Sequence, residues 1–387
     1  MWQLGSFADM LKLNGYLRIL KRSNEGAPYL ATVTAAATSN HTVLVASRDH
    51  VTGSYKAVLL DGAAPLDKLE GDVFELSELF DHLTSGDIVR LSPASGAIRV
   101  LYRRNSPSNT VLLTERCDHY CLMCSQPPKT PNDDWLLAEA FELIQLIPPS
   151  AQELIFSGGE PTLYGLRLVE LIRHAKKWLP KTALHVLTNG RAFSDIKFAG
   201  SYAAVEHPDI MTGIPIYSDD PSHHDYIVQS RGAFNETVQG VLNLKKAGER
   251  VEIRIVIHKE TLDRLVKTCE FIARNLVIVD HVALMGLEVT GFARYNLDNL
   301  WVDPFDYKDI LSEAVTLLNN YRIPTSVYNH QLCTVNTDVF GNCKKSISDW
   351  KREYLPECVP CTRRDQCGGL FSSGSLYRHS RHIRPLF

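Results

Sequence analysis

TVLLTERCDHYCLMC at residues 110–124 and ELIFSGGEP at residues 153–161 are the two stretches that decide the fold of this 387-residue chain. Each begins with a short apolar run that favours a β-strand and ends in cysteines or in a glycine pair. Between them, DWLLAEAFELIQLI at 134–147 has the apolar spacing of an amphipathic helix. Because a strand, a helix and a strand in this order are joined by a right-handed crossover, the two strands are predicted to be parallel.

The same alternation of strands and helices continues to about residue 320. Further strands are expected within 183–190, 210–218, 251–258 and 280–286, and further helices within 165–178, 234–248 and 261–275. Six such units are too few to close an eight-fold barrel, so the fold class is α/β with a partial (β/α)6 TIM-like barrel. Functional groups are expected at the carboxyl ends of the strands, where the first cysteines and GGEP both lie.

Two further regions flank this predicted core domain of residues 109–320. Residues 1–108 predict a small β-rich domain with a hairpin at 86–104, helical pieces at 6–13 and 74–83, and a hinge at 105–109. This domain is expected to bind a substrate or partner, and unchanged peptide affinity after deletion of residues 1–105 would contradict that. Residues 321–387 are rich in Cys, Gly, Pro and Arg and are expected to fold around a metal.

Composition excludes several classes of partner. Lys and Arg total 41 against 44 Asp and Glu, so no net field draws the chain to nucleic acid or anionic lipid. No apolar run reaches the roughly 20 residues of a membrane span, and the N-terminus does not have a secretory pattern, so a cytoplasmic location is expected. Nine cysteines, an odd number that is mostly clustered, then indicate metal binding or catalysis rather than a disulfide framework. Cys269, which stands alone in a helix pattern, is expected in the core.

The first cysteine group follows a predicted strand directly. Cys117, Cys121 and Cys124 have the spacing C-x3-C-x2-C, and thiolates on one loop suit an iron–sulfur cluster or zinc. Zinc would need a fourth protein ligand, and His119 is pinned between two of the cysteines. A cubane cluster held by three cysteines instead leaves one iron open.

Together with the six-fold alternation, these motifs resemble the radical SAM (S-adenosylmethionine) superfamily over roughly residues 110–300. The resemblance implies an iron–sulfur oxidoreductase whose catalytic 4Fe-4S cluster is bound by Cys117, Cys121 and Cys124. SAM would chelate the open iron, and the motif Gly158, Gly159, Glu160 and Pro161 would contact its methionine end. Glycines allow close backbone approach, and a glutamate can accept from an ammonium group. Reductive cleavage of SAM would give a 5′-deoxyadenosyl radical that abstracts hydrogen from a substrate.

Five other positions are implied cofactor contacts. Ser218 falls where the family often contacts the ribose, and Arg254 where it often meets the SAM carboxylate. Met285 and Gly286 belong to a stretch that resembles the backbone platform for adenine. Asn189 would bind near the cofactor. A turn explains Asn189 and Ser218 equally well, and an ordinary ion pair explains Arg254.

The second cysteine group resembles the auxiliary-cluster extension known as SPASM, or its shortened form, twitch. Cys358, Cys361 and Cys367 have the spacing C-x2-C-x5-C. One auxiliary 4Fe-4S cluster is expected, with Cys333 as fourth ligand and Cys343 as the alternative. Structural zinc on the same thiolates is the other interpretation.

Three segments of the sequence resemble HxsC, a radical SAM maturase of His-Xaa-Ser repeat systems. They are TERCDHYCLMCSQPPK at 114–129, SISDWKREYLPEC at 346–358 and CGGLF at 367–371. The resemblance implies a peptide maturase acting on a ribosomal precursor peptide (a RiPP), which gains a cross-link or an oxidation. The implied partners are a second radical SAM maturase and an external electron donor such as flavodoxin or ferredoxin. The alternatives are a radical SAM enzyme acting on a small molecule and, more distantly, a zinc-binding interaction module, which leaves GGEP unexplained.

Overall fold

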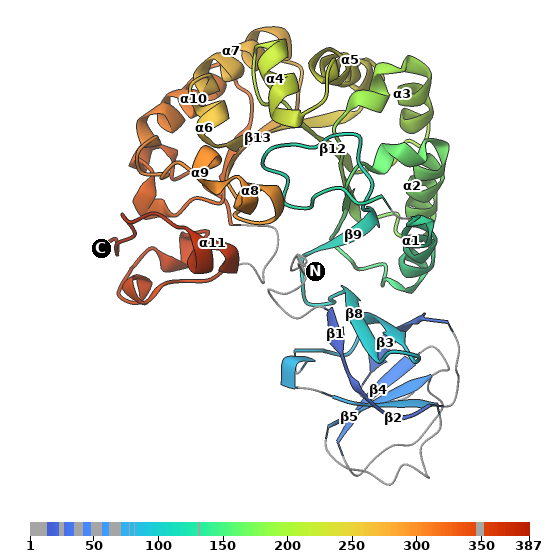
Figure 1. The fold of residues 1–387 in the computed structure, drawn as a ribbon. Coiled ribbons are helices and arrows are strands. Elements are labelled where there is room, and N and C mark those ends of the chain that lie inside the picture. Colours follow the sequence, from blue (N-terminus) through green and yellow to red (C-terminus); the bar gives the residue numbers. More distant parts are fainter. Residues whose placement is uncertain are drawn as a thin grey trace.

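The computed structural model describes residues 14–22, 27–34, 42–47, 56–61, 71–76, 78–80, 82–130, 132–345 and 352–387. In these ranges the strands form two separate sheets, one of eight strands in the N-terminal part and one of seven in the remainder (Figure 1). The helical piece predicted at 6–13 lies outside the described residues.

The seven-stranded sheet is wholly parallel and follows chain order from one edge to the other. Its strands are β9 (Ser108–Thr114), β10 (Glu153–Gly158), β11 (Ala183–Leu187), β12 (Ile210–Pro215), β13 (Arg250–Ile257), β14 (His281–Gly286) and β15 (Thr325–Tyr328). The first six are the predicted strands, so the partial-barrel fold class is confirmed. A seventh strand, β15, was not predicted: it follows the predicted core domain, has only four residues, and becomes a strand through its pairing with β14.

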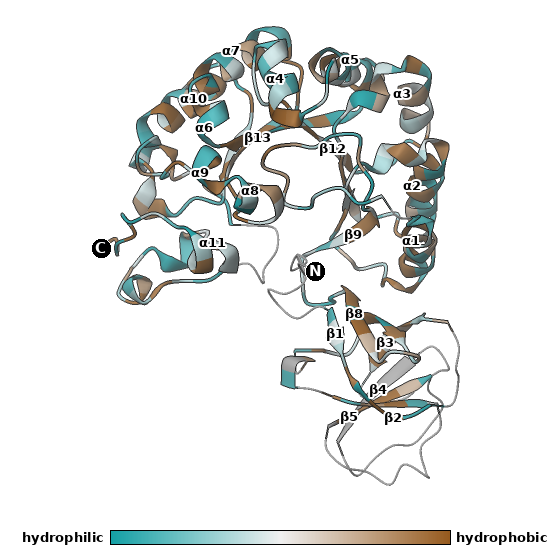
Figure 2. Ribbon diagram, viewed as in Figure 1, coloured by the Kyte–Doolittle hydropathy of each residue, from teal (hydrophilic) through white to brown (hydrophobic). Residues whose placement is uncertain are grey.

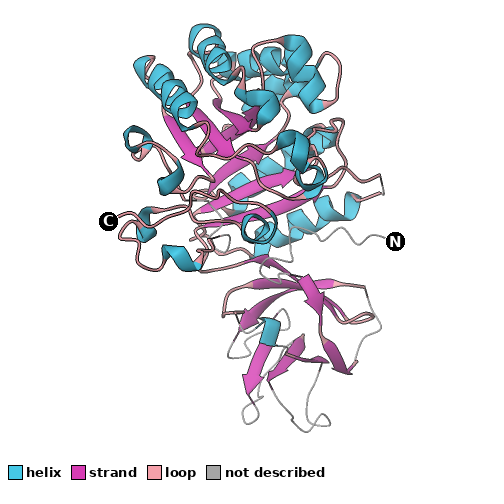
Figure 3. Ribbon diagram, turned by 60° about the vertical axis from the view of Figure 1, so that its left-hand side comes forward, coloured by secondary structure: helices cyan, strands magenta, loops and turns pink. Residues whose placement is uncertain are grey.

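Helices cover the outer face of this sheet, as the arc in Figure 1 and the side view in Figure 3 show. The described helices of the core are α1 (Asp134–Leu146), α2 (Leu166–Trp178), α3 (Ile196–Ala203), α4 (Pro221–Val228), α5 (Ala233–Lys246), α6 (Lys259–Leu262), α7 (Leu265–Asn275), α8 (Gly291–Tyr295), α9 (Leu297–Leu300) and α10 (Lys308–Asn320). Cys269 on α7 is buried in this core, as predicted. None of the helices in the described ranges is long and apolar enough to cross a membrane.

The two faces of the parallel sheet differ in chemistry because side chains alternate along a strand. Apolar residues such as Phe156, Val186 and Ile253 join the core under the helices. Residues of the opposite set, including His185, Glu252 and Arg254, face the lumen of the partial barrel and interact with one another. Figure 2 shows the brown, apolar character of the strands against teal helix surfaces. The core therefore lies between strands and helices, and the polar face is left for function.

The N-terminal sheet has the order β1-β8-β7-β3-β4-β5-β6-β2, with β1 and β2 at opposite edges. Only Leu17 separates these two strands along the chain, so one short stretch of chain forms both edges of the sheet. The sheet therefore curls round its own apolar core. Its strands are β1 (Asn14–Tyr16), β2 (Arg18–Lys21), β3 (Tyr29–Thr34), β4 (Thr42–Ser47), β5 (Ala57–Asp61), β6 (Asp72–Glu75), β7 (Ile88–Ser92) and β8 (Ala97–Tyr102).

Two local predictions in this region have different outcomes. The hairpin at 86–104 is confirmed as the antiparallel pair β7–β8, with Gly96 at φ 73° in the turn. The helical piece predicted at 74–83 is wrong, because Asp72–Glu75 pairs as strand β6 and only a single 3-10 turn, Glu78–Phe80, follows. The predicted hinge at 105–109 overlaps β9, which begins at Ser108.

The N-terminal sheet packs on helix α1 of the core. Arg90 and Arg99 lie 3.3 and 3.9 Å from the carboxylate of Glu139, and the Arg90 guanidinium covers the Trp135 ring at 4.1 Å. The same helix begins beside the loop that carries the first three cysteines. One helix thus contacts both the N-terminal sheet and the candidate site.

Candidate active site

The first three cysteines lie on the loop between β9 and α1, inside the arc of helices (Figure 1). Asp133, at the start of α1, holds the beginning of this loop. Its carboxylate accepts hydrogen bonds from Thr114 Oγ1 (2.8 Å), the Glu115 backbone N–H (2.5 Å) and Arg116 Nε (2.8 Å). In sequence, Asp133 has the signature of a helix cap. Its role in the loop depends on contacts that only the fold creates.

The far side of the loop is held by backbone contacts with later helices. The N–H groups of Tyr120 and Leu122 donate to the carbonyls of Val228 and Ile227, and the Phe292 N–H donates to the Cys124 carbonyl at 2.7 Å. The cluster loop is therefore fixed by elements from both halves of the barrel.

The three thiols are close enough to influence one another. Burial, with neighbouring negative charges that include Cys124, raises the pKa of Cys117 to about 12, and burial with the charges of Cys124 and Cys117 also raises that of Cys121. All three side chains keep partial exposure. Such thiols stay protonated until a metal replaces the proton.

The GGEP motif packs directly against this loop. The Gly159 and Glu160 N–H groups donate to the carbonyls of Thr114 and Arg116, each at 2.8 Å. A Cβ on Gly159 would stand 2.1 Å from the Arg116 oxygen and 3.1 Å from Cys117 Cβ. Gly159 is therefore required for the approach of the β10 end to the residue that precedes the first cysteine.

Glu160 is buried, and its carboxylate is occupied by donors of the chain itself. Oε1 accepts from Thr162 N–H (2.9 Å), Thr162 Oγ1 (2.6 Å) and Thr188 Oγ1 (2.7 Å), and Oε2 accepts from Asn189 N–H (2.5 Å). Burial raises the pKa of Glu160. In the structure this carboxylate ties the end of β10 to the end of β11, while Pro161 begins a buried 3-10 turn.

Asn189 and Ser218 both shape turns at strand ends. Asn189 Oδ1 accepts from Arg191 N–H at 3.0 Å, and its Nδ2 donates to Asp118 of the cluster loop at 2.6 Å. Ser218 is fully buried and accepts from Asp220 N–H at 3.1 Å. Asp118 also pairs with Arg191 at 3.0 Å. Sequence reasoning missed this Asp118 contact, because 71 and 73 positions separate the partners.

Arg254 and Met285, two predicted cofactor contacts, lie side by side. Arg254 Nη2 is 3.2 Å from Met285 Sδ, and its Nη1 donates to Glu252 at 2.6 Å. Gly286 faces the backbone of Asn329, whose oxygen would lie 2.5 Å from an added Cβ. The structure thus brings Arg254, Met285 and Gly286 together on the β13–β14 side of the barrel mouth.

Tyr217 was not singled out in the sequence. It follows β12 and packs with Met123 of the cluster loop in a small apolar cluster. Burial, together with the charges of Cys121 and Cys124, raises the pKa of its phenol, and Arg254 acts on the same phenol in the opposite direction. Tyr217 therefore packs on the cluster loop and is close enough to Arg254 for its charge to act on the phenol.

Buried histidines lie in and next to the cluster loop. His223 and His224 lie on helix α4, and His224 is buried with its Nδ1 accepting from Tyr217 N–H at 3.2 Å. His119 is also buried, and the charged groups acting on its imidazole are Asp118, Arg191, Asp225 and Glu236. His119 is thus part of the cluster loop itself, whereas His224 contacts Tyr217, which packs against the loop.

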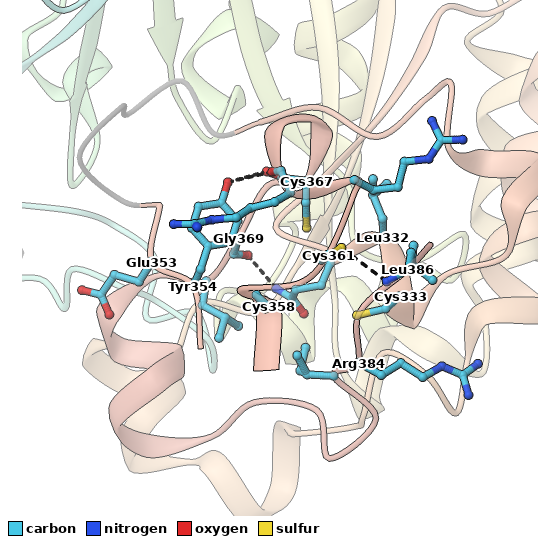
Figure 4. A pocket seen from close by; sticks show the side chains of 15 residues that line it. Leu332, Cys333, Glu353, Tyr354, Cys358, Cys361, Cys367, Gly369, Arg384 and Leu386 are labelled. Atoms are coloured by element: carbon cyan, nitrogen blue, oxygen red, sulfur yellow. Dashed lines mark hydrogen bonds between the residues drawn. The ribbon is translucent and has the colours of Figure 1, made fainter. Parts of the chain in front are cut away.

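A second group of four thiols lines one hollow in the C-terminal part of the chain. They belong to Cys333, Cys358, Cys361 and Cys367 (Figure 4). The final residues of the chain close this hollow, since Leu386 N–H lies 3.4 Å from Cys361 Sγ. Beside it, Gly368 and Gly369 lead into the last described helix, α11 (Ser372–Tyr377).

Cys343 is placed differently from these four thiols. It forms a bridge with Val327 of β15 and packs against the main apolar core, and it does not line the hollow. Between the two candidate fourth ligands, the geometry favours Cys333.

The donor sets fit iron–sulfur clusters by chemistry, with three soft thiols in one loop and four in one hollow. Within the described ranges, no set of three or more His, Cys, Asp or Glu side chains already has the arrangement of a metal site.

Comparison with known proteins identifies the core. Residues 111–272 match the model of the Radical SAM superfamily. SuiB of Streptococcus suis bound to S-adenosylmethionine is a similar solved structure, with 14% identity, a TM-score of 0.45 and coverage of 59% of this chain and 51% of that one. anSMEcpe with bound AdoMet and the Cp18Cys peptide shows 18% identity and a TM-score of 0.44, covering 56% of this chain and 62% of that one.

Methylornithine synthase (PylB) is similar with 12% identity and a TM-score of 0.43, covering 57% of this chain and 64% of that one. The chain thus spans about half of SuiB and less than two thirds of the other two. The superfamily implies a 4Fe-4S cluster and SAM as cofactors. Residues 111–272, which carry the cysteine loop and GGEP, are therefore a radical SAM domain, and such a domain supports an iron–sulfur enzyme.

Proposed function

We propose that this enzyme cleaves SAM reductively and modifies a ribosomally synthesised peptide of the His-Xaa-Ser type, forming a cross-link or an oxidised carbon. One observation carries the cofactor chemistry: three cysteines share a loop at the carboxyl end of β9, and Gly159 packs against that loop with no room for a side chain. The peptide substrate rests on the resemblance of residues 114–129 and 346–371 to His-Xaa-Ser maturases.

In this proposal Cys117, Cys121 and Cys124 hold the catalytic 4Fe-4S cluster. When bound, the cluster supplies the electron that cleaves SAM, and the resulting 5′-deoxyadenosyl radical removes a hydrogen atom from the substrate. The chain's own contribution is to hold the loop still and to exclude water. Asp133 and Asn189 do the first through the contacts described above, and the buried Tyr217 contributes to the second.

The backbone of Gly158 and Gly159 would approach the methionine end of SAM, with Arg254 at its carboxylate and the Met285–Gly286 backbone at its adenine. Glu160, Asn189 and Ser218 would act by fixing the turns at three strand ends, because their side chains already bond within the chain.

We also propose one auxiliary 4Fe-4S cluster on Cys333, Cys358, Cys361 and Cys367. The shared hollow supports this ligand set over one with Cys343. Four protein ligands would leave no open iron, which suits electron transfer rather than substrate binding. A flavodoxin or ferredoxin would supply electrons, and a second radical SAM maturase would act on the same peptide in the cytoplasm.

Iron and sulfide counting after anaerobic reconstitution tests both clusters. The wild type is expected to hold about eight irons, and a Cys117→Ala, Cys121→Ala, Cys124→Ala variant about four with no SAM cleavage. Cys333→Ser is expected to lose about four irons, whereas the matched control Cys343→Ser keeps about eight, because only Cys333 lines the hollow.

Other outcomes separate the parts of the proposal. About four irons in the wild type, all lost in the triple variant, would indicate that the C-terminal cysteines bind zinc or have only a structural role. Equal iron loss in Cys333→Ser and Cys343→Ser would contradict the ligand assignment. A reconstituted wild type that did not cleave SAM would overturn the proposed reaction.

A further inference from the structure

A network of charged side chains lies on the lumen face of the parallel sheet. It joins His185 of β11, Glu252 and Arg254 of β13, His281 of β14 and Ser326 of β15. Strand pairing places Glu252 directly beside His281, and their sheet neighbours Ile253 and Val282 belong to the apolar core on the other face. The network therefore crosses four strands on the side where the cluster loop lies.

Glu252 is the centre of this network. Its Oε1 accepts from Arg254 Nη1 at 2.6 Å, and its Oε2 lies 2.8 Å from His281 Nδ1. His281 Nε2 is in turn 2.9 Å from Ser326 Oγ, and His185 Nε2 stands 3.5 Å from Glu252 Oε1. The Glu252 side chain is only 7% exposed. Arg254 of the same strand and His185 of β11 thus contact Oε1, while His281 of the neighbouring strand β14 contacts Oε2.

Stability alone does not account for such a group. The desolvation of a buried ion pair offsets most of its attraction, so apolar residues of similar volume would hold the sheet together about as well. What the pair does provide is a fixed arginine. The Arg254 side chain is only 18% exposed and would otherwise lose considerable rotamer freedom on binding a ligand.

The second terminal nitrogen of Arg254, Nη2, does not take part in the ion pair with Glu252. Among the described residues, the hydrogen-bond partner of Nη2 is the thioether sulfur of Met285 at 3.2 Å, and a thioether is a weak acceptor. Tyr217, which packs on the cluster loop, lies within electrostatic range of the same guanidinium. The Nη2 group, held only by a weak acceptor among the described residues, can therefore turn to a stronger one near the loop that carries Cys121 and Cys124.

We propose that Glu252 is a positioning residue that fixes Arg254, so that the free arm of the guanidinium meets the carboxylate of SAM. His281 and His185 fix the position of the Glu252 carboxylate, and this carboxylate in turn fixes the position of the Arg254 guanidinium. This inference rests on the proposed function, in which SAM binds at this mouth of the barrel. A preorganised arginine binds a carboxylate more tightly because less conformational entropy is lost on binding.

The test is the Kd of SAM, measured by anaerobic equilibrium dialysis on reconstituted full-length enzyme with equal iron content. Glu252→Gln is expected to weaken SAM binding about tenfold. Arg254→Met is expected to weaken it by at least that factor. In the Arg254→Met background, Glu252→Gln is expected to cause no further loss, since the glutamate acts through the arginine.

A matched ligand and a matched variant sharpen the result. Decarboxylated SAM lacks the group that Arg254 would bind, so Glu252→Gln is expected to leave its Kd unchanged. Glu270→Gln removes a carboxylate paired with Arg274 at 2.7 Å on the exposed side of helix α7, and is expected to bind SAM like the wild type. If Glu252→Gln loses iron, His281→Gln loosens the same carboxylate while keeping the ion pair, and weaker SAM binding is again expected.

Unchanged SAM affinity in Glu252→Gln, or in His281→Gln where that variant is needed, would overturn the inference. Independent losses in the double variant, or equal weakening for decarboxylated SAM, would overturn it as well. A wild-type enzyme that held its iron but bound no SAM would overturn the proposed function itself, and that result is recognisable before any variant is made.

Discussion

Gly159→Ala is expected to remove most of the catalytic cluster and to lower SAM cleavage by more than about 100-fold. The added methyl would stand 2.1 Å from the Arg116 carbonyl oxygen and 2.6 Å from its carbon. Both are backbone atoms, so the end of β10 and the cluster loop would have to separate, and Cys117 would move with the loop. Iron content after reconstitution and 5′-deoxyadenosine release measure the effect.

Gly200→Ala is the matched control for this substitution. It lies in helix α3, where an added Cβ meets nothing within 4 Å, and alanine favours a helix more than glycine does. Full iron and full SAM cleavage are expected in this variant. Normal iron content in Gly159→Ala would show that the contact between GGEP and the cluster loop is dispensable.

The second large effect is loss of stability between pH 6.5 and pH 4. Burial lowers the pKa of His185 and His330 to about 4 and of His224 and His258 to about 3. In the unfolded chain a histidine titrates near pH 6.5. Each of the four therefore stays neutral in the folded protein over a range in which the unfolded chain takes up a proton.

Because the unfolded state binds more protons in this range, the free energy of unfolding falls as the pH falls. The stability from each neutral histidine is fully present above pH 6.5 and is lost as the pH drops toward its folded pKa. At about 1.4 kcal/mol per pKa unit, one such histidine costs about 3 kcal/mol at pH 4. Four together reach on the order of 10 kcal/mol, comparable to the whole stability of a typical domain.

Urea unfolding followed by circular dichroism, repeated from pH 7.5 to pH 4.5, checks this expectation. The urea midpoint should fall steadily below pH 6.5. His258→Phe should fall less steeply, because both ring nitrogens of His258 are buried without a hydrogen-bond partner and the variant has no proton to gain there. A midpoint that did not change with pH would contradict burial of these four imidazoles in neutral form.

The sequence by itself determined the elements whose signal is local. The apolar runs that become β9 to β14 and the amphipathic pattern of the core helices can be read without a structure, and so can the spacing of Cys117, Cys121 and Cys124. The position of these cysteines at a strand end followed from chain order alone. Strand β15 was missed because four residues carry too little pattern, and pairing with β14 supplies the rest.

Only the tertiary structure decided which distant groups meet. It places Cys333 in the hollow with the last three cysteines and Cys343 against the edge of the main core, although both precede the same motif. It shows the Glu160 carboxylate bonded within the chain, and it joins Glu252 to His281 across 29 positions. Side-chain patterns along one strand report which face is buried, but they carry no information about the partner strand. Contacts between elements are fixed by packing the whole sheet, and the candidate site is made of such contacts.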